Sequence, residues 1–272
     1  MSFSVYSRGL LAGDRISYAL LSPDEVGIFE SLRTYGEEIF RKEEHVRRFL
    51  ESAQTAGLKG ILEKDTAREL DLALDAFRKE HPEAGDLFIR LMLWRKEVRV
   101  MIGERIHPPA LYEKGASLKT SPVRRSLSNA SPPEAKTSAY QNAAFASLEP
   151  KTPAVFEWLF LDNSGTVTEV RTGNLFLAKD GSLATPPTAG ILDGVTRRFV
   201  IECARKIGIP VRETPLTRHD VFNAGEAFLT NTSWEILPVA ELDGRRIGRT
   251  VPGPVTLKLR QIFRQRTMGK NR

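Results

Sequence analysis

The chain of 272 residues is long enough for one large domain or two modest ones with a hydrophobic core. Its composition, 41% hydrophobic and 27% charged, is that of an ordinary soluble globular protein, and no apolar run approaches the roughly 20 residues that a membrane helix needs. The net charge of +6 comes from basic residues interleaved with acidic ones, which argues against a nucleic-acid partner and suits a site for small anions. We interpret the densest basic cluster, at 119–126, as part of a solvated surface.

The single cysteine, Cys203, excludes an internal disulfide and suits a reducing cytoplasm. It falls in an apolar helical pattern, where we interpret it as a small core residue rather than a nucleophile. The N-terminal sequence lacks the basic segment and long apolar core of a secretory signal. We therefore expect a cytoplasmic protein with no membrane partner.

The first part of the chain predicts a sheet with two helices. Its elements are a strand at 27–35 with a short partner at 39–40, helices at 43–58 and around 65–80, and a hairpin of strands at 87–94 and 98–102. Gly57 can close the first helix. The strand at 87–94 is apolar nearly throughout except at Arg90, and such a charge either snorkels or is directed at a ligand.

A connector with two prolines and a glycine follows, HPPALYEKGAS. Domain boundaries commonly fall in such stretches. We therefore expect a small N-terminal domain at 1–107, an interdomain linker at 108–117 and a large C-terminal domain at 118–272.

Hairpins predominate beyond this connector. The expected elements are strands at 156–162 and 166–170, a hairpin at 174–186 that turns at Asp180-Gly181, a helix at 195–208, strands at 209–216, 227–233 and 236–248, and a helix at 254–265. Mixed helices and strands with many hairpins predict an α+β fold with antiparallel or mixed sheets.

Motifs of several common enzyme classes are absent from the sequence. None of the four histidines pairs with a cysteine or carboxylate at metal-ligand spacing, so no metal site is expected. There is no GxSxG, Walker or dinucleotide fingerprint. Three features remain: Lys136 among small neutral residues with a helix-like pattern, Glu169 after a hairpin turn, and Gly-Val-Thr at 194–196 at a helix start.

These three features can act on one ligand. A desolvated lysine can attack a carbonyl and form a Schiff base. A carboxylate can keep a pyridine nitrogen protonated, and a helix start can hold a phosphate. Together the roles describe a pyridoxal 5′-phosphate site, although each feature alone is a weak signal.

The chain resembles the class IV aminotransferases, the fold-type IV pyridoxal-phosphate enzymes, from about residue 26 to 263. That family includes branched-chain aminotransferases, D-amino-acid aminotransferases and 4-amino-4-deoxychorismate lyases. Five segments in the family's order carry the resemblance: 26–53, 135–146, 165–186, 190–213 and 226–248.

The resemblance implies two α/β domains, a small N-terminal one and a larger C-terminal one with a mixed sheet, and pyridoxal 5′-phosphate in the cleft between them. It implies amino-acid and 2-oxo-acid substrates, and active sites at a homodimer interface.

The resemblance also implies roles for individual residues. Lys136 matches the Schiff-base lysine, and Glu169 matches the glutamate that faces the pyridine nitrogen. Tyr140 matches a tyrosine that contacts the cofactor or positions the lysine, with a packed core aromatic as the alternative. Arg48, off the apolar stripe of its helix, matches the phosphate-binding arginine, whereas its neighbour Arg47 is expected to be solvated.

Further phosphate contacts follow from the same comparison. Val195 and Thr196 would offer backbone N–H groups, and Thr232 would offer its hydroxyl. The family often has proline just before this Gly-Val-Thr, where Asp193 stands here; we expect it to act as an N-cap.

The substrate side leaves alternatives open. Arg33 and Arg90 are candidates to bind a substrate carboxylate, and Phe29, Arg33 and an arginine near Arg90 resemble the branched-chain enzymes. These usually have glycine where Ser31 stands, whereas the lyases often place a hydroxyl there. D-amino-acid enzymes often have lysine in place of Arg33, and residues 19–27 depart from the family's usual run.

We therefore expect an amino-acid aminotransferase, with branched-chain amino acids among its candidate substrates. The alternative is a 4-amino-4-deoxychorismate lyase, which would form 4-aminobenzoate and pyruvate in the folate pathway.

Overall fold

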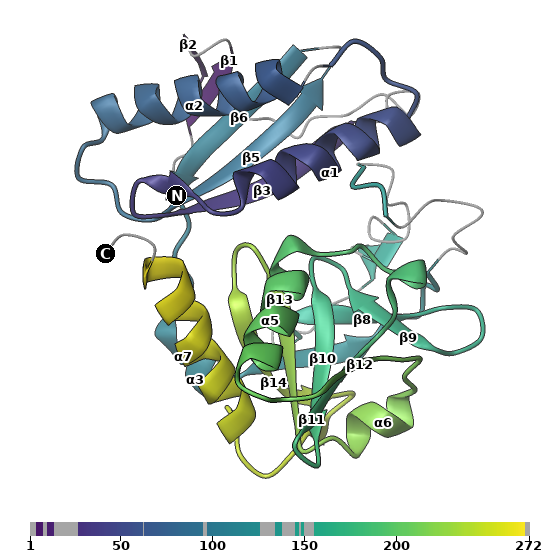
Figure 1. The fold of residues 1–272 in the computed structure, drawn as a ribbon. Helices are drawn as coiled ribbons and strands as arrows, with labels where there is room; N and C mark the ends of the chain where they lie inside the picture. The colour runs from purple at the N-terminus through teal and green to yellow at the C-terminus, as the bar shows by residue number, and fades with distance from the viewer. Residues whose placement is uncertain are drawn as a thin grey trace. The chain divides into compact units, whose positions relative to one another are not determined.

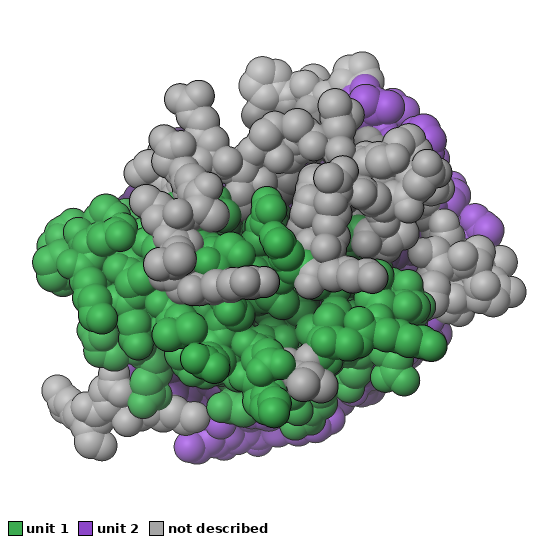
Figure 2. All heavy atoms as spheres, turned by 90° about the horizontal axis from the view of Figure 1, so that it is seen from above, with its two compact units in different colours: residues 1–106, 135–139 green, residues 107–134, 140–272 purple. Residues whose placement is uncertain are grey.

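The structure is a computed structural model that describes residues 4–7, 10–13, 27–61, 63–94, 97–125, 134–137, 145–146, 148–149 and 155–269. The chain divides into two compact units, residues 1–106 with 135–139 and residues 107–134 with 140–272 (Figure 2). Each unit has its own sheet and its own hydrophobic core. None of the helices described is long and apolar enough to cross a membrane.

In its described part, unit 1 contains a six-stranded antiparallel sheet in the order β2-β1-β6-β5-β3-β4. The strands are β1 Ser4–Ser7, β2 Leu10–Gly13, β3 Ile28–Tyr35, β4 Glu38–Ile39, β5 Leu87–Trp94 and β6 Glu97–Glu104. Helices α1 (Lys42–Thr55) and α2 (Glu63–Glu80) lie side by side on one face of this sheet (Figure 1).

Strand β3 sends alternate side chains to opposite faces of the sheet, as the period of two requires. Ile28 and Leu32 join the core against the helices, and Glu30 is buried on that same face. The opposite, half-buried face of the strand carries Phe29, Ser31 and Arg33.

Helix α1 confirms the sequence prediction closely. Glu43 and Glu44 in its first turn complement the positive end of the helix dipole. Val46 and Phe49 are buried in the core of unit 1. Gly57 adopts a left-handed φ of 73° just past the C-terminus, where glycine is favoured.

Unit 2 contains a mixed sheet, which the described residues arrange as β12-β11-β10-β13-β14-β7-β8-β9 with β15 paired to β14 (Figure 1). The pairs β11–β12, β14–β7 and β7–β8 are parallel, and the other pairs are antiparallel. The strands are β7 Ala116–Thr120, β8 Glu157–Leu161, β9 Val167–Val170, β10 Asn174–Lys179, β11 Ser182–Thr185, β12 Val211–Glu213, β13 Glu226–Asn231, β14 Glu235–Leu242 and β15 Arg245–Arg246.

The helices of unit 2 are α3 Pro109–Lys114, α5 Val195–Lys206, α6 Arg218–Phe222 and α7 Pro254–Met268, with a 3₁₀ turn at Thr188–Gly190. Helices α5 and α7 pack against each other and on strand β13 (Figure 1). The rings of Phe199 and Phe263 join the two helices, with centroids 5.0 Å apart. Cys203 is completely buried, which confirms its interpretation as a core residue.

The segment predicted as a linker differs from that prediction, because it forms regular structure within unit 2. Pro109 begins helix α3, a position where proline is tolerated, and strand β7 pairs between β14 and β8. Proline and glycine signals are local and do not reveal which strands a short segment will pair with. The division at residues 106 and 107 lies beside the expected boundary, but residues 135–139 belong to unit 1 rather than to the large domain.

Candidate functional site

Lys136 is held by its backbone against strand β3 and helix α1 of unit 1. Its N–H donates to Ser52 Oγ at 2.9 Å, and its carbonyl accepts from the N–H of Phe29 at 3.3 Å. Thr137 forms an antiparallel bridge with Ile28. The segment is therefore extended at this point rather than helix-like, because its backbone pairs with the start of β3.

The side chain of Lys136 lies over an aromatic ring. Its Nζ is 4.8 Å from the ring centroid of Phe29, and the guanidinium carbon of Arg90 is 5.0 Å from the same centroid. Cations at these distances interact favourably with the face of the ring. Phe29 thus contacts both the predicted cofactor lysine and a predicted substrate arginine.

The four predicted substrate residues share one face of the sheet in unit 1. Ser31 pairs directly with Arg90 across β3 and β5, and Phe29 and Arg33 flank Ser31 at the alternate positions of β3. Arg33 also lies 3.5 Å from Asp86. The structure therefore brings together residues that the sequence places on two separate strands.

Arg48 forms a buried ion pair on the helix-covered face of the same sheet. Its Nε donates to Glu30 Oε2 at 2.8 Å, and its Nη2 donates to Glu30 Oε1 at 2.7 Å. His45 Nδ1 lies 3.3 Å from Glu30 Oε1. Arg47, in contrast, is exposed as expected.

Burial and charge act in opposite directions on these groups. Burial alone would raise the pKa of Glu30, but the charge of Arg48, the nearby His45 ring and the hydrogen bonds from Arg48 outweigh it and hold that pKa well below its usual range. Burial lowers the pKa of His45, and the positive charges of Arg48 and Lys136 add to this effect against the opposing influence of Glu30.

These directions predict that unit 1 loses stability in mild acid. In the unfolded chain His45 takes up a proton near its ordinary pKa of about 6.5, whereas in the folded chain it does so only at lower pH. The unfolded chain therefore binds more protons just below pH 6.5, and the free energy of unfolding should fall as the pH drops below about 6.5. We expect His45→Gln to reduce this loss between about pH 6.5 and 5, above the range in which Glu30 would be protonated in the unfolded chain. Urea unfolding at pH 6.5 and pH 5 measures the free energy of unfolding of both proteins. An equal loss of that free energy in wild type and variant would contradict the prediction.

Glu169 is a buried carboxylate on strand β9 of unit 2. Arg125 Nη2 lies 2.6 Å from its Oε1, Asn174 Nδ2 donates to Oε2 at 3.1 Å, and the N–H of Leu192 donates to both oxygens at 3.2–3.3 Å. Sequence reasoning missed Arg125, because it assigned the basic cluster at 119–126 to a solvated surface. Arg125 is only 6% exposed, so that interpretation was wrong for this residue.

Asn174 links the carboxylate of Glu169 to the segment that leads into helix α5. Asn174 Nδ2 also donates to the carbonyl of Leu192, two residues before Gly194, the residue that precedes the helix. Val195 and Thr196 are buried in the first turn. N–H groups in a first turn have no acceptor within their own helix, and they carry the positive end of the dipole.

The predicted N-cap role of Asp193 is wrong. The helix is preceded by Gly194, and no side chain caps it. Instead, Asp193 lies 2.8 Å from Arg198 Nη1 and 3.6 Å from Arg197 Nη1. The two arginines of the first turn thus offset the charge of a carboxylate that would otherwise oppose an anion here.

Thr232 lies in the turn between β13 and β14, which is closed by a hydrogen bond of 2.6 Å from the N–H of Trp234 to Asn231 Oδ1. Two residues before Thr232, on strand β13, Thr230 is the cross-strand partner of Asn174 and so shares its face of the sheet. Thr230 Oγ1 is buried and has no hydrogen-bond partner in the part of the chain that the structure describes. Tyr140 lies outside the described residues.

Gly194 makes the close approach of Asn174 possible. A Cβ at this position would collide with Asn174 Oδ1. We expect Gly194→Ala to displace the amide from Glu169 and Leu192 and to lower the free energy of unfolding by about 1–3 kcal/mol. Gly190→Ala is the matched control, since a Cβ there meets nothing within 4 Å. Urea unfolding of both variants measures the difference, and equal stabilities would contradict the prediction.

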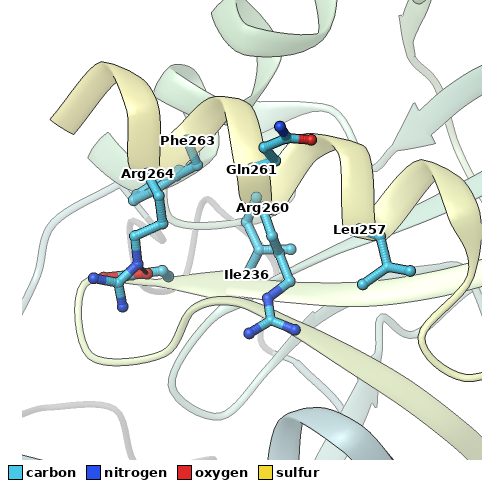
Figure 3. Close-up of a pocket in the computed structure, with 7 residues that line it drawn as sticks. Ile236, Leu257, Arg260, Gln261, Phe263 and Arg264 are labelled. Carbon is cyan, nitrogen blue, oxygen red and sulfur yellow. Dashed lines mark ion pairs between the residues drawn. The ribbon is translucent and has the colours of Figure 1, made fainter. Parts of the chain in front are cut away.

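A separate pocket of about 220 Å³ lies between α7 and β14 (Figure 3). Leu257, Arg260 and Arg264 project from one side of α7 toward the strand that carries Ile236. Arg264 Nε lies 2.7 Å from Glu235 Oε2. None of the predicted cofactor or substrate residues lines this pocket, so it is not the predicted site.

Each unit offers groups whose chemistry suits one part of a phosphorylated pyridine aldehyde. Unit 1 offers the amine of Lys136 and the guanidinium of Arg48, and unit 2 offers the carboxylate of Glu169 beside the start of α5. An amine suits an aldehyde, a carboxylate suits a pyridinium N–H, and a guanidinium or the N–H groups of a helix start each suit a phosphate. The described residues contain no group of three His, Cys, Asp or Glu side chains that could hold a metal.

Comparison with known proteins agrees with this chemistry. The family model of amino-transferase class IV matches residues 27–242. A putative branched-chain-amino-acid aminotransferase of Methanocaldococcus jannaschii is 34% identical over 274 residues, which cover 96% of this chain and 90% of that protein.

Solved structures of similar proteins match nearly the whole chain. A branched-chain amino acid aminotransferase of T.th. with pyridoxamine 5′-phosphate has a TM-score of 0.86 at 28% identity, covering 99% of this chain and 95% of that one. The branched-chain aminotransferase of Thermoproteus uzoniensis with norvaline has a TM-score of 0.83 at 29% identity, covering 99% and 96%. The fold-type IV, α+β expectation is thereby confirmed, and the chain belongs to the class IV aminotransferases, enzymes that depend on pyridoxal 5′-phosphate.

Proposed function

We propose that this aminotransferase exchanges an amino group between a branched-chain or similar aliphatic amino acid and a 2-oxo acid, with Lys136 as its central residue. The observation that carries the proposal is the placement of Lys136, whose backbone is fixed on β3 and α1 and whose Nζ lies 4.8 Å from the Phe29 ring. The similar proteins are named as branched-chain aminotransferases, which favours this function over the deoxychorismate lyase.

Pyridoxal 5′-phosphate, when bound, supplies an aldehyde for an amine and a pyridine ring that accepts electrons. The residues proposed to hold it share affinity for its charged or polar ends. Its phosphate would be bound by Arg48, the N–H groups of Val195 and Thr196, and the hydroxyl of Thr232. Its ring nitrogen would face Glu169, and Tyr140 would contact the cofactor or position the lysine.

Lys136 would act twice. Its Nζ would hold the cofactor covalently, and once displaced by the substrate amine it would take the proton from the substrate's Cα. The second role requires a neutral amine at that moment. The neighbouring Arg48 is paired with Glu30, so the two buried charges largely cancel in their effect on the amine of Lys136.

The substrate would lie on the face that carries Phe29, Ser31, Arg33 and Arg90. A guanidinium binds a carboxylate through two hydrogen bonds, so Arg33 and Arg90 are the candidates for the carboxylate end. Phe29 offers an apolar surface that suits an aliphatic side chain.

A half-reaction tests the function. Single amino acids are added to the cofactor-loaded enzyme without any 2-oxo acid, and the visible absorbance of the bound cofactor is followed. We expect leucine, isoleucine, valine or norvaline to cause a lasting loss of that absorbance. If no amino acid does so while 4-amino-4-deoxychorismate yields 4-aminobenzoate, the lyase alternative replaces this proposal.

A cytoplasmic homodimer with a partner loop over each site remains an expectation from the family resemblance. Light scattering on the purified protein would give twice the chain mass of 30.4 kDa if it holds.

A further inference from the structure

We propose that Glu30 is a positioning residue, which fixes the guanidinium of Arg48 at a set separation from Lys136, so that one cofactor reaches both. The inference rests on the proposed function, in which Arg48 binds the phosphate and Lys136 the aldehyde. All residues that carry it lie in unit 1.

Glu30 holds Arg48 by two hydrogen bonds along one edge of the guanidinium. These are the bonds of 2.8 Å from Nε and 2.7 Å from Nη2. Oε1 also accepts the N–H of Ser31 at 2.7 Å, and the carboxylate is completely buried. Two parallel bonds to a planar fork fix its orientation as well as its position, which a single bond would not do.

A closed ring of contacts then joins Arg48 to Lys136. Ser52 Oγ donates to the carbonyl of Arg48 at 2.8 Å and accepts the N–H of Lys136 at 2.9 Å. The carbonyl of Lys136 accepts from Phe29, which precedes Glu30 in the chain. The ring runs through helix α1 on one side and strand β3 on the other, so both predicted cofactor groups are anchored on regular elements.

The spacing matters because the aldehyde and phosphate of the cofactor are a fixed distance apart. Functional groups must be held to within about 0.5 Å of the productive geometry. An arginine side chain has many rotamers, and the Glu30 pair selects one of them.

Electrostatics alone predicts the opposite outcome for loss of Glu30. A buried carboxylate beside Arg48 opposes a phosphate, so removing its charge would strengthen phosphate binding if charge were its whole contribution. Glu30→Asp separates the two effects, because it keeps the charge and withdraws the carboxylate by about 1.5 Å, one carbon–carbon bond.

The test compares the binding of pyridoxal 5′-phosphate with that of pyridoxal, which lacks the phosphate. The ratio of the two dissociation constants gives the preference for the phosphorylated form. Dissociation constants of both are measured on the full chain freed of cofactor, for wild type, Arg48→Ala, Glu30→Asp and Ser52→Ala. We expect Glu30→Asp to lower the preference for the phosphorylated form about 10-fold and Ser52→Ala about 3-fold. Pyridoxal affinity should stay within about twofold of wild type.

Glu44→Asp is the matched control. It makes the same glutamate-to-aspartate change on helix α1, in a part-exposed pair of 2.7 Å with Arg41, and it should leave the preference unchanged. If Glu30→Asp weakens both ligands equally, Glu30 is merely structural and the proposal is overturned.

Two further outcomes separate this inference from the function on which it rests. If Arg48→Ala lowers the preference but Glu30→Asp and Ser52→Ala do not, Arg48 binds phosphate without this support, and only the positioning role fails. If Arg48→Ala leaves the preference unchanged, the phosphate assignment itself fails, and the inference with it. Should Glu30→Asp not fold, an unchanged preference in Ser52→Ala overturns the proposal by itself.

Discussion

Replacement of Lys136 by alanine is expected to lower turnover by about 10⁴-fold and to abolish the visible absorbance of bound cofactor. The substitution removes the amine that would hold the cofactor and move the substrate proton. The fold should survive it, because the hydrogen bonds to Ser52 and Phe29 use the backbone of residue 136. The substitution does remove the contact of Nζ with the Phe29 ring, so we expect a change of at most about 1 kcal/mol in the free energy of unfolding.

Lys119→Ala is the matched control for this variant. Lys119 is exposed, and its Nζ lies 5.8 Å from the Trp158 ring, as that of Lys136 lies over Phe29. It should keep full turnover. Addition of a small amine such as methylamine to Lys136→Ala should restore part of the lost rate, since the missing group is a proton acceptor. A Lys136→Ala enzyme with wild-type turnover would contradict the whole assignment.

Local signals in the sequence predicted much of the fold. The period of 3.6 located helices α1 and α5, and Gly57 and Gly208 follow them with φ of 73° and 75°. The Asp180-Gly181 turn has two positive φ angles, 49° and 74°, as a tight hairpin between β10 and β11 requires. Such features depend on neighbours in the chain, so one sequence suffices to find them.

Pairings between distant segments could not be predicted in the same way. Strand β7 is short and half polar, and only its parallel partners β14 and β8 make it a strand. Arg125 stands beside Arg124 in one basic cluster, yet the first is buried against Glu169 and the second is exposed. Nothing in the local sequence distinguishes the two arginines.

Glu30 is an intermediate case. In the strand at 27–35 it occupies the same alternating face as Ile28 and Leu32, so the period of two places a carboxylate in the core. A buried carboxylate needs a charged partner. The alternation therefore contained a signal for the ion pair, but not the identity of Arg48 as the partner.

The second large effect is expected at Glu169. We expect Glu169→Gln to lower turnover by about 100-fold, because the neutral amide cannot stabilise a protonated pyridine nitrogen as the carboxylate would. The same change leaves Arg125 buried without its charged partner at 2.6 Å. Breaking a buried ion pair in this way costs about 3–5 kcal/mol of stability. Steady-state rates and urea unfolding measure the two effects separately.

A double variant separates catalysis from stability at this residue. Arg125→Met with Glu169→Gln removes both charges, and replacing a buried pair by uncharged groups is often close to neutral for stability. We therefore expect the double variant to recover most of the lost stability but none of the lost turnover. Glu157→Gln is the control, since it neutralises another buried carboxylate, 3.4 Å from Arg171, and should leave turnover unchanged. If the double variant regained turnover together with stability, Glu169 would serve the fold of unit 2 and not the chemistry of the cofactor.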